Sequence, residues 1–122
     1  MLTRDAILAV DDLKREKLDV PEWGGTIYVR TLTGAERDGF EEAVYGDKGS
    51  LKNVRARLAA LVTCDKDGKR LFLDTDIAAL GAKSSAALGR IFDLGMKLNG
   101  IGKKDIEDLE KNSEGAPSAA SG

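Results

Sequence analysis

The sequence predicts an α+β domain that is mostly helical, with an N-terminal β-hairpin and a second, shorter hairpin. Three observations support this fold class. Apolar residues recur at helical spacing in several segments, most clearly over 51–62. Two β-prone runs flank a Pro/Gly-containing connection within 17–32. The chain has 122 residues, the length of one domain and too few for two separate cores.

The N-terminal part is expected to form a short helix and then the better of the two hairpins. Thr3 is a good N-cap, and the helix should run to about Asp12. Strands at 17–20 and 26–32 then flank the loop 21–25. Their pairing would place Tyr28 and Arg30 on one face of the hairpin. The opposite face would hold four apolar side chains, Leu18, Val20, Ile27 and Val29.

Two helices are expected next. Thr33 and Glu36 have the spacing of a capping box, which predicts a helix that starts at Thr33 and ends at Gly46 and Gly49. Its apolar stripe is narrow and consists of Phe40, Ala43 and Val44. The next helix should follow Ser50, with an apolar face of Leu51, Val54, Leu58, Leu61 and Val62. Its solvent-facing side would carry Lys52, Arg55 and Arg57.

The C-terminal half is expected to contain the second hairpin and two more helices. Strands at 62–64 and 70–73 would be joined by a turn at Asp67-Gly68. A short helix should start at Asp74 and close at Gly81. A longer helix, capped by Ser84 or Ser85, would end at Gly100, with Leu88, Ile91, Phe92, Gly95 and Leu98 at helical spacing. We expect one domain over 1–112, with a last amphipathic turn through Ile106 and Leu109, and a disordered tail over 113–122.

The composition limits the classes of function. Nineteen basic and 21 acidic residues leave a net charge of −2, which argues against a nucleic-acid partner. The N-terminus lacks the apolar run of a signal peptide, and no apolar stretch is long enough to span a membrane. Cys64 is the single cysteine, so no intrachain disulfide can form. These features predict a protein of the cytoplasm with no membrane partner.

The residue types argue against catalysis and cofactor binding. Histidine is absent, which removes the usual general base and zinc ligand. Asp65-Lys66-Asp67-Gly68 lacks the glycine position of a calcium-binding EF-hand and is better interpreted as a hairpin turn. Gly100 to Lys104 lacks the spacing of a phosphate-binding loop. The acidic residue after Cys64 disfavours a reactive thiolate. We therefore predict no catalytic, cofactor-binding or metal-binding residues.

Three aromatic residues are the candidates for partner binding. Trp23 lies in the hairpin loop, Tyr28 on a hairpin strand and Phe72 on the second hairpin. Trp and Tyr are over-represented at protein interfaces, which favours an anchoring role. Trp23 has an equally good alternative as a lid that folds back onto a small core.

The segment 20–38 resembles the tail assembly chaperones of long-tailed bacteriophages and prophages. The similarity rests on Val-Pro-Glu-Trp-Gly-Gly at 20–25 and on Arg-Thr-Leu-Thr-Gly-Ala-Glu-Arg at 30–37. It extends to the Leu-Thr-Arg-Asp start at 2–5, to Asp-Gly-Lys-Arg-Leu-Phe at 67–72 and to Leu-Glu-Lys-Asn at 109–112. These motifs form turns, caps and strands, so they identify a fold family better than an activity.

The resemblance implies a non-enzymatic helper that coats the tape measure protein, keeps it soluble and helps tail tube subunits assemble around it. It also implies work in the host cytoplasm, absence from the mature virion, possible self-association and, in some members, a longer form made by ribosomal frameshifting. The alternative is a small phage structural adaptor, such as a head–tail connector, that stays in the virion. A small enzyme or regulator is the least favoured class, because histidine and ligand-binding motifs are missing.

Overall fold

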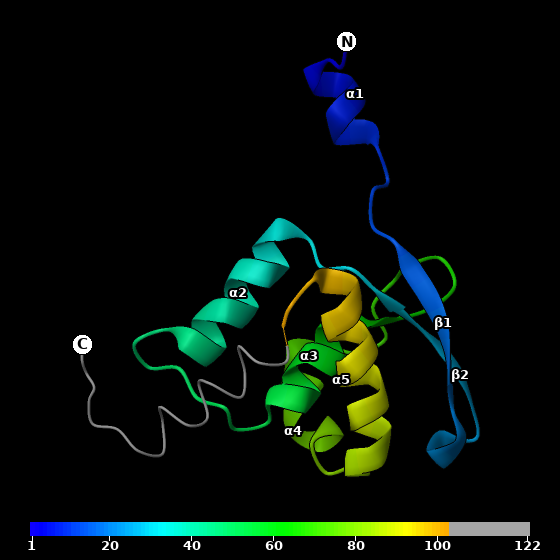
Figure 1. The fold of residues 1–122 in the computed structure, drawn as a ribbon, viewed down its shortest axis with the longest axis vertical. Coiled ribbons are helices and arrows are strands. Elements are labelled where there is room, and N and C mark those ends of the chain that lie inside the picture. The colour runs from blue at the N-terminus through cyan, green and yellow to red at the C-terminus, as the bar shows by residue number, and fades with distance from the viewer. Residues whose placement is uncertain (103–122) are drawn as a thin grey trace.

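The computed structural model describes residues 1–102, which form helices packed against a small antiparallel sheet (Figure 1). This arrangement confirms the predicted α+β class. The expected turn through Ile106 and Leu109 and the tail 113–122 lie outside the described residues. The elements, in chain order, are α1 (Arg4–Ala9), β1 (Arg15–Val20), η1 (Pro21–Trp23), β2 (Gly25–Arg30), α2 (Gly34–Tyr45), α3 (Val54–Val62), β3 (Thr63–Cys64), η2 (Asp74–Asp76), α4 (Ile77–Leu80) and α5 (Ser85–Asn99).

The N-terminal hairpin forms in the predicted way. β1 and β2 pair antiparallel with Leu18 opposite Ile27, so the four predicted apolar side chains share one face. Val20 and Val29 are fully buried, while Leu18 and Ile27 pack against the edge of the core. Figure 1 shows this hairpin running alongside the helices, with α5 next to it. The alternation of apolar residues therefore set the register, as expected for a sheet buried on one face.

The second hairpin is shorter than predicted. β3 pairs with β2, which makes a three-stranded sheet in the order β1-β2-β3. On the return side only one bridge forms, between Cys64 and Arg70, so the expected strand over 70–73 is wrong beyond Arg70. The Leu73 amide donates instead to Asp76 at the start of η2, which turns the chain away from the sheet. The predicted turn is present, with Gly68 at a φ of 87°.

The helix starts follow their predicted capping residues at α1, α2 and α5 and differ from the prediction at α3. Thr33 and Glu36 form the predicted capping box, and the Ser84 hydroxyl accepts from the first amides of α5. α3, however, begins at Val54 and not directly after Ser50, because Asn53 adopts a left-handed φ of 57°. α1 ends at Ala9, three residues before the expected end, since Val10 is extended.

α3 lies at the centre of the molecule. Seven of its nine residues are buried, so its surroundings are apolar on nearly every side. α5 packs against it at Gly95, where an added Cβ would lie 3.3 Å from Val62 and 3.4 Å from Leu58. Asn99, at the end of α5, accepts a hydrogen bond from the Leu32 amide, and its carbonyl accepts one from Arg37 of α2. These bonds connect the end of α5 to the start of α2.

Candidate partner-binding site

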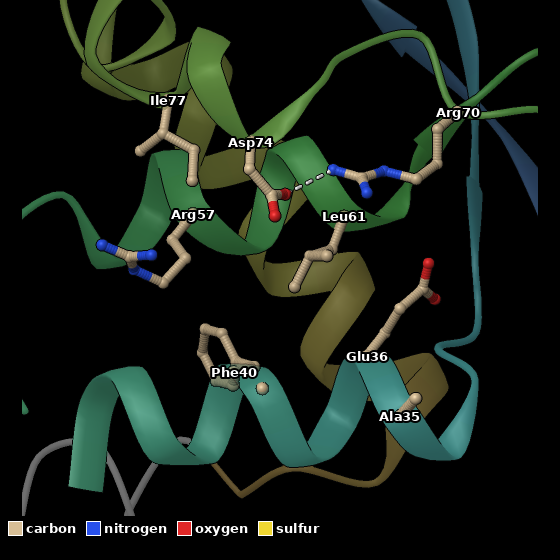
Figure 2. Close-up of a pocket in the computed structure, with 9 residues that line it drawn as sticks. Ala35, Glu36, Phe40, Arg57, Leu61, Arg70, Asp74 and Ile77 are labelled. Carbon is tan, nitrogen blue, oxygen red and sulfur yellow. Dashed lines mark hydrogen bonds and ion pairs between the residues drawn. The ribbon is translucent and has the colours of Figure 1, made fainter. Parts of the chain in front are cut away.

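An open groove of about 290 Å³ lies between α2, α3 and the start of α4 (Figure 2). Its apolar floor is formed by Phe40 from α2, Leu61 from α3 and Ile77 from α4. Gly39 leaves space on the α2 side, because an added Cβ there would meet no atom within 4 Å. Ligand pockets usually measure roughly 300–1,000 Å³, so this groove suits one or two side chains better than a whole cofactor.

Most of the charges around the groove are already paired. Arg70 donates to Asp74 at 3.0 Å, and Figure 2 shows this pair at one end of the groove. Glu36 pairs at 2.8 Å with Arg30, which is almost completely buried. Burial opposes ionisation of Glu36, but hydrogen bonds from Arg30 and the Thr33 amide, together with nearby arginine charges, outweigh it and lower the pKa of this carboxyl.

Arg57 differs from the other charged residues of the groove. It reaches from α3 to one side of the groove, and its Nε is shielded from solvent without a hydrogen-bond partner. The prediction that Arg57 points to solvent was therefore wrong, because its side chain is half-buried between α3 and α2. Within residues 1–102 its guanidinium forms no ion pair or hydrogen bond. A guanidinium without an ion-pair partner favours a ligand that brings a carboxylate.

Trp23 lies at the tip of the hairpin, partly buried against the core. The carboxylate of its neighbour Glu22 pairs with Arg90 of α5 at 3.0 Å, which holds the tip against that helix. The hydrogen bond from Arg90 lowers the pKa of Glu22. Trp23 thus occupies the lid position that the sequence left open, with part of its surface accessible to a partner.

Tyr28 and Phe72 lie on separate parts of the molecule. Tyr28 sits in β2 between Lys17 and Cys64 and is half-buried. Phe72 is packed against the core, while its neighbours Leu71 and Leu73 are 50% and 69% exposed. None of the three aromatic candidates lines the groove. Leu71 and Leu73, however, lie in the loop between the groove residues Arg70 and Asp74.

The groove was not predicted from the sequence because its walls come from segments that are distant along the chain. A signal existed at Arg57, a cation in a helix that otherwise, apart from Arg55, contains only Val, Ala and Leu. A second signal was Gly39, a helix-interior glycine with no turn to explain it. Both residues face the groove.

Outside the groove, two further side chains, those of Cys64 and Asp65, have altered pKa values without forming a site. Burial raises the pKa of the Cys64 thiol, although the charges of Arg30 and Arg15 act in the opposite direction. Asp65 accepts hydrogen bonds from the amides of Asp67 and Lys69, so its carboxylate stabilises the turn. These backbone hydrogen bonds, chiefly that from Lys69, lower its pKa. In the part of the chain that the structure describes, no cluster of metal-ligating side chains occurs and no helix is long and apolar enough to cross a membrane.

Comparison with solved structures identifies the fold. The chain is similar to the tail assembly chaperone of bacteriophage HK97, with a TM-score of 0.56 and 19% sequence identity. The similarity covers 70% of this chain and 85% of the HK97 protein. No family model and no curated protein matches the sequence. The chain therefore has the fold of a phage tail assembly chaperone, as its sequence motifs implied.

Proposed function

We propose that this protein is a non-enzymatic phage tail assembly chaperone, which binds the tape measure protein, keeps it soluble and helps recruit tail tube subunits. The observation that carries the proposal is the fold shared with the HK97 tail assembly chaperone over 85% of that protein. The sequence resemblance over 20–38 supports the same class independently of the fold.

The groove supports the proposal physically. An amphipathic helix of a client can insert an apolar side chain between Phe40, Leu61 and Ile77, as in other helix-in-groove complexes. A carboxylate beside that side chain would pair with the guanidinium of Arg57, which forms no ion pair or hydrogen bond within residues 1–102. Leu71 and Leu73 extend the apolar surface next to the groove. Trp23, Tyr28 and Phe72 remain proposed additional contacts.

The contacts offered by each copy are small, which suits a reversible coat. A groove that accepts one or two side chains gives weak binding, yet many copies on one long client gain affinity through effective concentration. Such a chaperone acts in the host cytoplasm and leaves before the virion is complete. This behaviour requires no covalent chemistry.

The test is co-expression with the tape measure protein, followed by pull-down and a solubility assay. We expect the wild type to keep the client soluble. Gly39→Phe adds a bulky side chain at the groove, and its Cβ would meet no atom within 4 Å. This variant should reduce capture at least about tenfold, equivalent to ~1.4 kcal/mol of binding free energy. The matched control is Gly89→Phe on α5, where an added Cβ also meets no atom within 4 Å.

Two outcomes would contradict the proposal. If the client stays insoluble and this protein elutes alone, the chaperone function is wrong. If mass spectrometry finds the protein in purified virions at the level of a structural component, the adaptor alternative replaces it. Equal capture by Gly39→Phe and wild type would retain the function but move the client site away from the groove, and Trp23→Ala would then test the hairpin tip.

A further inference from the structure

α1 presents apolar side chains that nothing in the described chain covers. Leu2, Ile7, Leu8 and Val10 are between 51% and 74% exposed, and α1 contains no buried residue. Figure 1 shows α1 projecting away from the rest of the molecule. Isolated helices shorter than about 12–15 residues are marginal in water, and α1 has six residues. We call residues 1–10 the N-terminal arm.

The arm is connected to the body by a short link. Leu13 is partly buried, and two hydrogen bonds fix Lys14 to Thr31. The Lys14 amide donates to the Thr31 hydroxyl at 3.1 Å, and the Thr31 amide donates to the Lys14 carbonyl at 2.9 Å. Only residues 10–12 therefore lie between α1 and this fixed point. To reach the groove of its own molecule, the arm would have to reverse its direction within these three residues. A second molecule can approach the arm without that reversal.

The groove and the arm have complementary surfaces. The floor of Phe40, Leu61 and Ile77 matches the aliphatic side chains of the arm in character, and its size suits one or two of them. The arm is followed by Asp11 and Asp12, of which Asp11 makes only a loose pair with Arg15, at 3.8 Å and 72% side-chain exposure. Arg57 supplies a guanidinium that has no acceptor within residues 1–102.

We propose that the N-terminal arm of one copy docks in the groove of a second copy. Aliphatic side chains of α1 enter the apolar floor, and Asp12 accepts a hydrogen bond from Arg57 of the receiving copy. The arm and the groove are different surfaces, so every molecule offers one of each. Contacts of this heterologous type propagate from copy to copy and form rings or open helical chains. The inference does not depend on the proposed function, but an arm and a client side chain would compete for the same groove.

The test is sedimentation velocity of the full chain over a range of concentrations. We expect the mass of the wild type to rise with concentration. Leu8→Asp places a charge on the arm, and Gly39→Trp fills the groove, so each variant should stay monomeric. Gly89→Trp, at an equally open helix position on α5, should associate like the wild type. Thermal melts of all variants check that they are folded.

Mixing the two monomeric variants gives the sharpest result. Leu8→Asp retains a groove and Gly39→Trp retains an arm, so an equimolar mixture should form a 1:1 dimer and nothing larger. Charge reversal is a second test. Asp12→Arg and Arg57→Glu should each weaken association, and the double variant should restore it. A mixture that stays monomeric, or a double variant no better than the single ones, would overturn the proposal.

A disulfide trap separates docking between copies from docking within one. Leu8→Cys combined with Ile77→Cys should give cross-linked dimers and larger species under oxidation, whereas Leu8→Cys with Lys66→Cys, on the exposed turn, should not. The native Cys64 is fully buried and should not interfere. A bond that closes within a single chain would refute docking between copies. Client capture by Leu8→Asp tests the proposed function separately, because this variant leaves the groove intact.

Discussion

Glu36 takes part in two interactions at once. Its Oε1 accepts from the Thr33 amide to complete the cap of α2, and its Oε2 pairs with Arg30. The Arg30 side chain is 5% exposed and that of Glu36 is 21% exposed, so this pair is far better shielded than a surface salt bridge. Removing one charge would leave the other buried without compensation, which is the costly case for ion pairs.

We predict that Glu36→Gln lowers the free energy of unfolding by about 3 kcal/mol at neutral pH, at the low end of the range for breaking a buried pair. Gln can still accept from the cap amide, so the change isolates the charge. Because folding lowers the pKa of Glu36, its stabilisation is present above the ordinary Glu value near 4.5 and is lost as pH falls through the lower folded value.

Urea denaturation of both proteins at several pH values measures this effect. The difference between wild type and variant should shrink as the pH falls below about 4.5 and Glu36 becomes protonated. Glu41→Gln is the control, since Glu41 pairs with Arg37 on the same helix but is 46% exposed, and its loss should cost at most about 0.5 kcal/mol. Equal effects of the two substitutions would show that the burial of Arg30 does not matter.

The cap of α2 was predictable from the sequence, whereas the role of Arg57 was not. Thr33 and Glu36 lie three residues apart, and a capping box needs no other part of the chain. The surroundings of Arg57 depend on where α2 packs against α3. The helical period of α3 alone places Arg57 at the edge of the apolar stripe and does not say what lies beside it. Arg30 shows the same limit, because the alternation puts it on the face opposite the four apolar side chains, yet it is almost fully buried and paired with Glu36.

At the scale of elements, two glycines of α5 differ in how closely other residues pack against them. Gly95 lies where α3 and α5 approach each other, with Val62 and Leu58 within 3.4 Å of an added Cβ. Gly89 has open space around it, so its only effect on the helix is the conformational entropy that glycine loses on folding.

We therefore predict that Gly89→Ala raises the free energy of unfolding by about 0.5–1 kcal/mol, as expected for an open helix-interior site. Gly95→Leu should lower it by about 1–3 kcal/mol, because the added atoms overpack the contact between α3 and α5. Thermal or urea denaturation of the two variants compares the effects within one helix. A destabilised Gly89→Ala would show that the space around this position is not open in solution.

Element boundaries were predicted less well than element types. The start of α3 moved to Val54 because Asn53 takes a left-handed conformation, which no helical pattern announces. The strand expected over 70–73 reduced to one bridge, because Asp76 caps η2 by accepting from Leu73 and leads the chain away. In both places a local hydrogen bond or backbone angle overrode a correct apolar pattern.

For the whole molecule, the class and the hairpin register followed from the sequence, while the pairing of β3 with β2 and the groove did not. β3 pairs with β2 across more than thirty residues of intervening chain, and the groove joins α2 with α3, η2 and α4. Such contacts depend on how amphipathic faces meet, which the pattern of a single segment does not specify. The exposure of α1 likewise becomes visible only once the body of the molecule is complete.

The buried position of Cys64 makes its alkylation rate a measure of how often the sheet opens. This thiol is the only one in the chain, has no exposed surface and lies between β2 and the bridge to Arg70. An alkylating reagent can reach it only when the sheet opens, so the alkylation rate counts opening events. We expect iodoacetamide to react far more slowly in buffer than in urea, with a rate that rises in Gly95→Leu and falls in Gly89→Ala. A rate in buffer equal to that in urea would mean that this edge of the sheet is open in solution.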